Sequence, residues 1–324
     1  MSTGKRVGLA LVAALLLSVL AGVLWVWKRP LEFFAWMGRR SLAGAGLVKV
    51  VVDSPVGQQT LWQGGSGPIL LLLHGAGDQA GAWSHVVPSL VGRYRLIVPD
   101  LPGHGESAPG TGPLTMGTEL AGLEAVVQNR ASDAPVILVG NSLGAWLAML
   151  YGVKHPEHVS RLVAVNGGAL RGDRPDLTLT PSNREEARKL FDALTDPGSL
   201  RVPDFVLDDV VRQARSGPLG RLASTSDDMQ NYLLEGRLNQ LTVPVDLLWG
   251  GADRMLSLEY ANRMEAGLPA ARLTVIPRCG HVPQQECPER FVAALEKILE
   301  QPPPQTRPPA TGQSLRQQAE TPPH

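Results

Sequence analysis

The chain has 324 residues, with 30 basic and 30 acidic side chains, so its formal net charge is zero. Hydrophobic residues make up 44% and charged residues 19%, which excludes a mainly disordered protein. The neutral balance gives no electrostatic case for binding nucleic acid, and 2 cysteines are too few for a disulfide scaffold or a structural zinc cluster. This composition is typical of a globular protein that can bury a sizeable core.

The N-terminal residues 1–46 form a distinct apolar segment, which we interpret as a membrane anchor and linker. The span Val7–Trp27 contains no ionisable side chain and is long enough to cross a bilayer as a helix. Aromatic residues gather at its end, as in the belt that holds a helix at a membrane surface; they are Trp25, Trp27, Phe33, Phe34 and Trp36. We expect a retained single-pass anchor. A cleaved secretory signal, which would leave a secreted or periplasmic protein, is the alternative.

Basic residues flank this span on both sides and do not decide which side of the membrane the body occupies. Lys5 and Arg6 precede the span, and more basic residues follow it: Lys28, Arg29, Arg39 and Arg40. A strict count of basic residues places the body in the cytoplasm, whereas short basic N-termini are typical of exported proteins. The side of the membrane stays open.

The C-terminal residues 301–324 contain 7 Pro, 5 Gln and one large aliphatic side chain, Leu315. Such a segment cannot bury enough apolar surface to offset its conformational entropy, so we expect a disordered tail. Removing both ends leaves residues 47–300, a normal size for one α/β domain.

The body alternates between short aliphatic runs and stretches with helical periodicity. The runs have the continuous apolar character of strands buried on both faces; they are Leu47–Val52, Ile69–Leu73, Leu96–Val98, Val136–Val139, Leu162–Val165, Val245–Trp249 and Leu273–Ile276. Helical stretches lie between several of them, including Leu114–Asn129, Leu143–Lys154 and Pro288–Leu299. This alternation predicts a mostly parallel sheet with helices on both faces, and Gln58–Trp62 as an antiparallel partner of the first strand.

A G-x-S-x-G pattern follows the strand predicted at Val136–Val139. It runs from Gly140 to Gly144 around Ser142 and precedes an apolar helix. A serine at such a sharp turn is exposed at a helix N-terminus, and the flanking glycines let neighbouring backbone pass closely. The pattern alone is weakly specific, but its place between a strand and a helix makes Ser142 the candidate nucleophile.

Two other loops follow predicted strands. The turn His74-Gly75-Ala76-Gly77 could direct backbone N–H groups at a developing oxyanion, with a plain turn as the alternative. It lacks the glycine spacing of a phosphate-binding loop. The second loop, Pro99–Ser107, contains Asp100 and His104, for which we favour structural roles.

A serine nucleophile needs a general base, and that base needs an orienting carboxylate. Asp253 and His281 each follow one of the last two predicted strands, so both would lie on the same edge of the sheet as Ser142. The chain order Ser, Asp, His is the one expected for this architecture. Another position for the acid holds Asn166, which cannot serve as an acid, and Asp246 lies inside a strand.

In combination, these motifs resemble those of the α/β-hydrolase superfamily over residues 47–300. The motifs are His74-Gly75, Gly103-His104-Gly105-Glu106-Ser107, the turn at Ser142, Trp249-Gly250-Gly251-Ala252-Asp253 and Gly280-His281. The resemblance implies the α/β-hydrolase fold, with a mostly parallel eight-stranded sheet, helices on both faces and a helical cap insertion. Serine at the sharp turn tells against the dehalogenase and epoxide-hydrolase branches, which carry aspartate there.

The resemblance also implies a role for each site residue. Ser142 would be the nucleophile, His281 the general base and Asp253 the acid that orients it. The backbone N–H groups of Ala76 and Leu143 would form the oxyanion hole.

Within the serine branch, the chain is most similar to bacterial esterases and monoacylglycerol-lipase-like enzymes with an N-terminal membrane segment. This implies hydrolysis of carboxylic esters, either lipid-like or with short to medium acyl chains. A carbon–carbon hydrolase or a thioesterase with the same three residues is an alternative, and a catalytically silent, membrane-tethered binding module is another. We expect no cofactor, no metal and no nucleic acid partner, and we interpret His155 and His158 as surface residues. The oligomeric state stays open.

Residues 168–240 interrupt the alternation, and we expect short helices that cover Ser142 as a cap. Their apolar side chains recur at helical spacing and would face the main domain, the substrate or both; they include Leu190, Phe191, Leu194, Phe205, Val206, Leu207, Val210 and Val211.

The cysteines, Cys279 and Cys287, stand on either side of His281 in the sequence. We expect buried free thiols, which are the commoner state. A disulfide is the alternative if the domain is exported to an oxidising compartment.

Overall fold

The centre of the molecule is an eight-stranded sheet in the order β1-β2-β4-β3-β5-β6-β7-β8. We describe it from a computed structural model that covers residues 3–172 and 176–305. The strands are β1 (Val48–Val52), β2 (Gln59–Gly64), β3 (Ile69–Leu73), β4 (Arg95–Pro99), β5 (Val136–Asn141), β6 (Val159–Val165), β7 (Val245–Gly250) and β8 (Ala271–Ile276). β2 pairs antiparallel with β1 and β4, and all other pairs are parallel. The predicted mostly parallel sheet is confirmed.

Alternating side chains of the central strands enter two separate hydrophobic layers. In β3, Leu71 and Leu73 belong to one layer, and Leu70 and Leu72 belong to the other. All of them are fully buried, because helices cover both faces of the sheet. This is why the strands read as continuous aliphatic runs and not as an alternation of apolar and polar residues.

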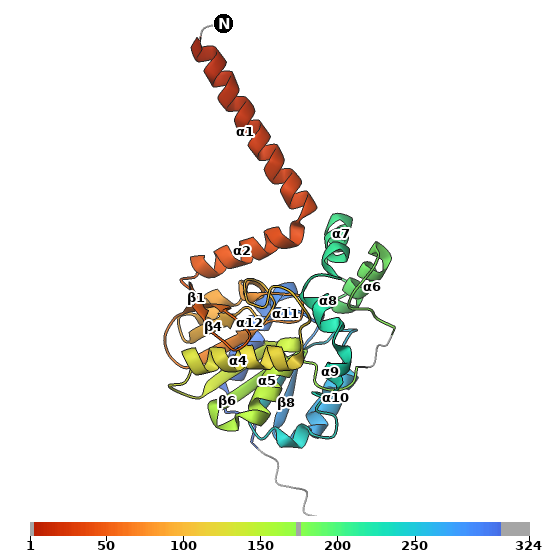
Figure 1. The fold of residues 1–324 in the computed structure, drawn as a ribbon. Coiled ribbons are helices and arrows are strands. Elements are labelled where there is room, and N and C mark those ends of the chain that lie inside the picture. Colours follow the sequence, from red (N-terminus) through yellow and green to blue (C-terminus); the bar gives the residue numbers. More distant parts are fainter. Residues whose placement is uncertain (1–2, 173–175, 306–324) are drawn as a thin grey trace, which may run out of the picture.

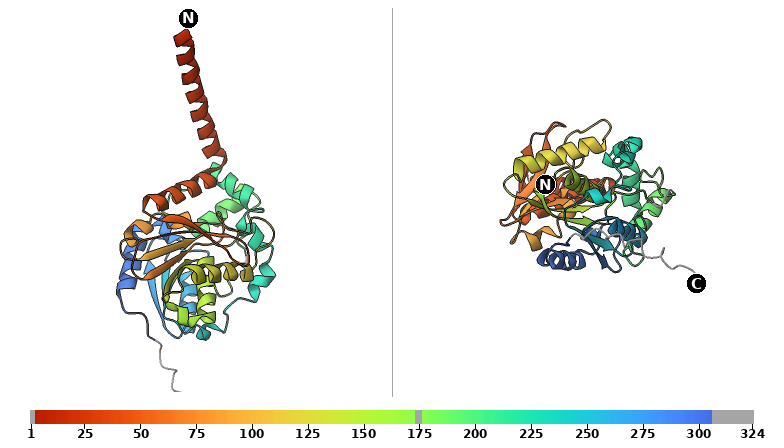
Figure 2. Two further views of the ribbon diagram at one scale, coloured as in Figure 1. Left: turned by 60° about the vertical axis from the view of Figure 1, so that its left-hand side comes forward. Right: turned by 90° about the horizontal axis from the view of Figure 1, so that it is seen from below.

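Helices form one layer on each face of the sheet (Figures 1 and 2). One face is covered by α4 (Met116–Arg130), α5 (Leu143–Lys154) and α10 (Leu258–Gly267). The other is covered by the short helices η1 (Ala80–Trp83) and α3 (Val87–Leu90) and by α12 (Pro288–Glu300). In α12, Phe291, Leu295 and Ile298 are buried at the helical spacing predicted from the sequence. Two short 3-10 turns, η2 (Pro156–His158) and η3 (Leu238–Gln240), precede β6 and β7 respectively.

The N-terminal segment forms two helices. α1 (Thr3–Lys28) projects away from the domain, and its stretch Leu11–Lys28 is apolar and long enough to cross a membrane, with no residue buried (Figure 1). The expected linker is largely a second helix, α2 (Pro30–Gly44), which lies across one end of the domain. Leu42 and Gly38 of α2 are buried against the domain, in contact with η1.

Residues between β6 and β7 form the expected short helices. These are α6 (Arg184–Leu194), α7 (Asp204–Gln213), α8 (Pro218–Ala223) and α9 (Ser226–Gln230). α7 packs against α6 and contacts both α1 and α2 (Figure 1). Phe205 of α7 stacks on Trp27 of α1, with 4.8 Å between ring centroids. The helices between β6 and β7 therefore adjoin the N-terminal helices.

The expectation of free thiols is wrong, because Cys279 and Cys287 form a disulfide. The short helix α11 (Pro283–Glu286) reverses the chain after β8 and brings the two Cα atoms to 6.1 Å. That separation lies in the range that a disulfide requires. Spacing in the sequence did not indicate this reversal. Most of the predicted tail, residues 306–324, lies outside the described residues.

Candidate functional site

Ser142 occupies the sharp turn between β5 and α5. Its backbone has φ 52° and ψ −114°, a conformation that a residue with a side chain adopts only when its surroundings enforce it. The surroundings do so through close backbone packing. A Cβ on Gly144 would collide with the carbonyl oxygen of Leu73, and a Cβ on Gly140 would collide with the backbone of Gly144. The Ser142 side chain is left half-buried at the carboxyl edge of the sheet.

The predicted base and acid are hydrogen-bonded to each other. His281 Nδ1 lies 2.7 Å from Asp253 Oδ2, and both residues are buried. Asp253 follows β7 and His281 follows β8, and these strands are parallel to β5 and β6. The sheet therefore brings all three predicted residues to one edge.

Asp253 is held by four hydrogen bonds. Its Oδ2 accepts from His281 Nδ1 and from Asn166 Nδ2 at 2.7 Å, and its Oδ1 accepts from the N–H groups of Met255 and Leu256 at 2.8 and 2.9 Å. This network fixes the direction in which the carboxylate faces the imidazole.

Asn166 is a site residue that the sequence reasoning missed. An amide cannot act as the acid, but the side chain of Asn166 bridges Asp253 to β7. Its Oδ1 accepts from Gly250 N at 2.9 Å while its Nδ2 donates to Asp253. The available signal was its place directly after β6, at the same edge as Ser142 and Asp253.

The main chain of His281 is also fixed. Its N–H donates to Leu194 O of α6 at 2.7 Å, and its carbonyl accepts from Asn141 Nδ2 at 2.9 Å. Because Asn141 precedes Ser142, the serine turn is attached directly to the histidine loop. His281 Nε2 is buried and has no hydrogen-bond partner among the described residues, so it is not hydrogen-bonded to Ser142 here. Such contacts are often long before substrate binds.

The glycine-rich turn after β3 lies beside Ser142. A Cβ placed on Gly75 would lie 3.3 Å from Ser142 Cβ, so this turn packs beside the serine, and Ala76 is the residue that follows Gly75. Leu143 begins α5, where N–H groups have no partner inside the helix. The predicted oxyanion donors thus come from the two segments that flank Ser142.

His74 holds this turn in place through two hydrogen bonds of its imidazole ring. Its Nδ1 donates to Gly75 O at 2.8 Å, and its Nε2 accepts from Leu101 N at 2.9 Å. Burial, and to a lesser extent the neighbouring His104, lowers the pKa of His74 to about 3. His74 therefore stays neutral and acts as a fixed spacer between two loops.

The loop Pro99–Ser107 has the structural role expected for it. Asp100 accepts from Ala80 N at 2.7 Å and from Glu106 N at 2.9 Å. His104 Nδ1 donates to Pro102 O at 2.9 Å, and burial lowers the pKa of His104 to about 4. These side chains hold the loop through hydrogen bonds to its own backbone and to Ala80 N.

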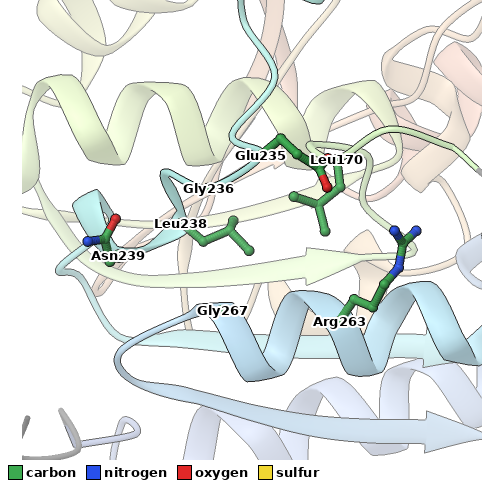
Figure 3. A pocket seen from close by; sticks show the side chains of 7 residues that line it. All are labelled: Leu170, Glu235, Gly236, Leu238, Asn239, Arg263 and Gly267. Carbon is green, nitrogen blue, oxygen red and sulfur yellow. The ribbon is translucent and has the colours of Figure 1, made fainter.

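Other candidate sites lie apart from this edge. A cavity of about 330 Å³ lies between α10 and the chain before β7, where Arg263 of α10 faces Leu170 and Glu235 (Figure 3). No predicted site residue lines it. A surface group of His155, Glu157 and His158 could offer metal ligands, but it lies beyond the C-terminal end of α5, the end remote from Ser142.

The geometry at the strand edge suits nucleophilic acyl transfer. It combines a serine hydroxyl at a helix N-terminus, a buried imidazole with an oriented carboxylate, and N–H groups from two flanking segments. These are the parts that activate a hydroxyl and stabilise the anion formed when it attacks a carbonyl.

Comparison with known proteins agrees with this geometry. The model of the alpha/beta hydrolase family matches residues 70–294. A pimeloyl-[acyl-carrier protein] methyl ester esterase of Nitrosomonas europaea is 32% identical over 252 residues, which cover 72% of this chain and 96% of the esterase. A 2-hydroxy-6-oxo-6-phenylhexa-2,4-dienoate hydrolase of Burkholderia cepacia is 26% identical over 253 residues, which cover 70% and 86% of the two chains.

Among solved structures, the chain is similar to a membrane phospholipase A described as a bacterial virulence factor. The identity is 28% and the TM-score is 0.71, and the match covers 91% of this chain and 98% of the phospholipase. The structural match is longer than the family match, which spans 225 residues. A match over 91% of the chain must also include residues outside the α/β domain, either in the N-terminal helices or after α12.

Proposed function

The chain belongs to the alpha/beta hydrolase family, and on that premise we propose that it is a serine hydrolase that cleaves carboxylic esters through an acyl-enzyme on Ser142. The observation that carries the proposal is the buried contact of 2.7 Å between His281 Nδ1 and Asp253 Oδ2, at the strand edge where Ser142 turns out of β5. A histidine that is oriented by a carboxylate at that place is suited to remove the proton of the serine hydroxyl.

The proposed mechanism has two halves. His281 Nε2 takes the proton of Ser142 Oγ as the oxygen attacks the ester carbonyl, and the N–H groups of Ala76 and Leu143 stabilise the resulting oxyanion. The imidazolium, stabilised by Asp253, returns that proton to the leaving alkoxide, and the alcohol departs. Water then gives a proton to Nε2 and attacks the acyl carbonyl. Collapse of the second intermediate releases the carboxylic acid and restores the Ser142 hydroxyl.

Within this chemistry we propose lipid-derived acyl esters as the substrate class. The apolar helix α1 would hold the domain beside a bilayer, and the similar solved structure is a membrane phospholipase A. The cap adjoins α1 because Phe205 stacks on Trp27. The helices that would cover the site would therefore lie near the bilayer, which contains such lipids.

Carbon–carbon bond hydrolysis is a second candidate, because the Burkholderia cepacia relative is named for a dienoate substrate. The same three residues could serve it. A screen of simple esters, thioesters and vinylogous diketones separates these activities, since only the last class reports cleavage of a carbon–carbon bond.

We propose that α2 completes the membrane attachment by lying at the headgroup surface. Its outer side exposes Phe34, Trp36 and Met37, each at least 44% exposed, and the Arg40 guanidinium lies 5.2 Å from the Trp36 ring centroid. Exposed aromatic and basic side chains on a helix that continues from an apolar span are typical of the interface of a membrane that contains anionic lipids.

The disulfide favours the exported side of the membrane for the body. Disulfides persist in oxidising compartments and are rare in the cytosol. The excess of basic residues after the span argues for the opposite, cytoplasmic side, so the two signals conflict. Thiol labelling of denatured protein from intact cells tests this, with no labelling of Cys279 and Cys287 expected before reduction. Full labelling without reductant would contradict it.

The direct test of the activity is hydrolysis of p-nitrophenyl butyrate by the full chain in detergent and by its Ser142→Ala variant. We expect turnover to fall by about four to six orders of magnitude in the variant. Ser89→Ala, which alters an exposed serine on the surface, is the matched control. Hydrolysis by Ser142→Ala at the parent rate would sink the proposal, and a parent that hydrolyses none of the screened compounds would favour a silent binding module.

A further inference from the structure

The last turn of the cap helix α6 contacts the loops of both the base and the acid. His281 N donates to Leu194 O at 2.7 Å, and Arg254 N, next to Asp253, donates to Ala193 O at 3.0 Å. Carbonyl groups in the last turn of a helix have no partner inside the helix, so they are free to accept such bonds. The cap therefore supports the two loops directly through its backbone.

One carboxylate strengthens this attachment. Glu286 Oε2 accepts from Gly280 N at 2.5 Å, while Oε1 accepts from Asp196 N at 2.7 Å and from Ser199 Oγ at 2.5 Å. Gly280 precedes His281, whereas Asp196 and Ser199 belong to the cap segment that follows α6. Hydrogen bonds to an ionised acceptor are about twice as strong as neutral ones. Glu286 thus joins the base's loop to the cap.

The packing at Gly280 shows how closely the loop that carries His281 approaches the cap. A Cβ there would collide with Leu194 O and would lie 2.8 Å from Glu286 Oε2. The disulfide between Cys279 and Cys287 closes the same loop, since its cysteines adjoin Gly280 and Glu286 in the chain. The loop is fixed internally by the disulfide, and Glu286 fixes it relative to the cap.

We propose that Glu286 is a positioning residue that places His281 by tying its loop to the cap segment 195–199. The inference rests on the proposed function, because it concerns the same base. It follows that the position of the cap on the main domain and the position of the His281 side chain are linked. A displaced cap withdraws Leu194 O, the acceptor of His281 N, and it also withdraws Asp196 N and Ser199 Oγ, the donors that hold Glu286. The base therefore loses its position when the cap opens.

The test compares the full chain with its Glu286→Ala, Glu286→Gln and Ser199→Ala variants, using p-nitrophenyl butyrate, the rate of labelling by a fluorophosphonate, and thermal unfolding. We expect kcat and the labelling rate to fall about 10- to 100-fold in Glu286→Ala with KM little changed, because a displaced base impairs chemistry more than binding. Glu286→Gln keeps one acceptor oxygen and should fall between parent and Glu286→Ala. Ser199→Ala, which removes one contact on the cap side, should have the smallest effect.

The control is Glu289→Gln, which alters an exposed carboxylate in the neighbouring helix. Folded Glu286 variants with kcat within about 2-fold of the parent would overturn the inference, and so would an equal loss in the control. If Glu286→Ala does not fold, Glu286→Gln decides by the same criterion. A parent that is active and labelled separates this result from failure of the proposed function, which would show as a parent that neither hydrolyses esters nor reacts with the probe.

Discussion

Asn166 and Asp253 come from the ends of neighbouring strands, and Asn166 Nδ2 donates to Asp253 Oδ2 at 2.7 Å. The same oxygen accepts from His281 Nδ1, so the amide and the imidazole share one acceptor atom. Asn166 is fully buried and has a backbone φ of 43°, which asparagine tolerates better than most residues. The amide therefore fixes the carboxylate on the side opposite its two main-chain donors.

This relationship predicts that Asn166→Ala lowers kcat about 10-fold with little change in KM, because Asp253 becomes free to turn away from His281. The variant also leaves Gly250 N without its acceptor, which costs about 1–3 kcal/mol of stability. Steady-state kinetics and denaturant unfolding measure the two effects separately. Asn129→Ala is the matched control, because that amide donates to Ala125 O within α4, away from the strand edge. An unchanged kcat in folded Asn166→Ala would restrict Asn166 to a structural role.

The disulfide predicts a stability difference that depends on redox state. Cys279 and Cys287 are 8 residues apart, and closing a loop of that size in the unfolded chain stabilises the native state by about 2–3 kcal/mol. The double variant Cys279→Ala/Cys287→Ala should therefore unfold at lower denaturant concentration than the oxidised parent. Adding reductant should destabilise the parent and leave the double variant unaffected. Equal stability of the two proteins under oxidising conditions would contradict the bridge.

Glu119 predicts a pH dependence of stability. Both carboxylate oxygens are buried without a hydrogen-bond partner among the described residues, and burial raises the pKa of Glu119 well above its usual value. Above pH 4.5 the unfolded chain releases this proton while the native state keeps it, so the group's contribution to stability falls as pH rises. The loss is about 1.4 kcal/mol per pH unit until the native carboxyl ionises.

Glu119→Gln removes this titration and keeps the shape. We expect the free energy of unfolding of the variant, relative to the parent, to increase between pH 5 and pH 8, measured by urea unfolding at each pH. Buried groups away from Glu119 titrate equally in both proteins and cancel in the difference. His104 Nδ1 lies 3.7 Å from Glu119 Oε1, but burial lowers the pKa of His104 to about 4, so native His104 stays neutral between pH 5 and pH 8. A stability difference that is constant with pH would show that Glu119 ionises freely in the native state.

The exposed side of α2 predicts a difference between soluble and membrane-bound substrates. Replacing Trp36 and Met37 by Ser should slow hydrolysis of a lipid ester embedded in anionic vesicles, because it weakens the contact that holds the domain at the surface. Hydrolysis of p-nitrophenyl butyrate should stay at the parent rate. Val275→Ser is the control, because Val275 is similarly exposed, at 41%, but lies on the edge strand β8. Equal losses on both substrates would argue against a membrane role for this surface.

The sheet and the strand-end residues could be predicted from the sequence because their signals are local. Aliphatic runs with helical stretches between them specify buried parallel strands, and Ser142, Asp253 and His281 each follow such a run directly. The glycine spacing around Ser142 is likewise a local sequence pattern, although Gly144 makes room for the backbone of Leu73 in β3. The predicted ends of parallel strands are therefore enough to show which distant residues lie at a common edge of the sheet.

The residues that support the site could not be predicted in the same way, because their roles depend on contacts between distant segments. The partners of Glu286 lie in a cap whose path no periodicity fixes, and the pairing of Cys279 with Cys287 depends on the reversal at α11. Asn166 was within reach, since it also follows a strand. Its position alone does not indicate that its amide donates to the carboxylate of Asp253.

The measurement that tests the central claim most directly is covalent labelling of the full chain by a fluorophosphonate, followed by intact mass and peptide mapping. The account predicts one probe molecule per chain, attached to Ser142, with no labelling of Ser142→Ala and parent-like labelling of Ser89→Ala. Labelling at another residue, or labelling that persists in Ser142→Ala, would contradict the assignment of Ser142 as the nucleophile.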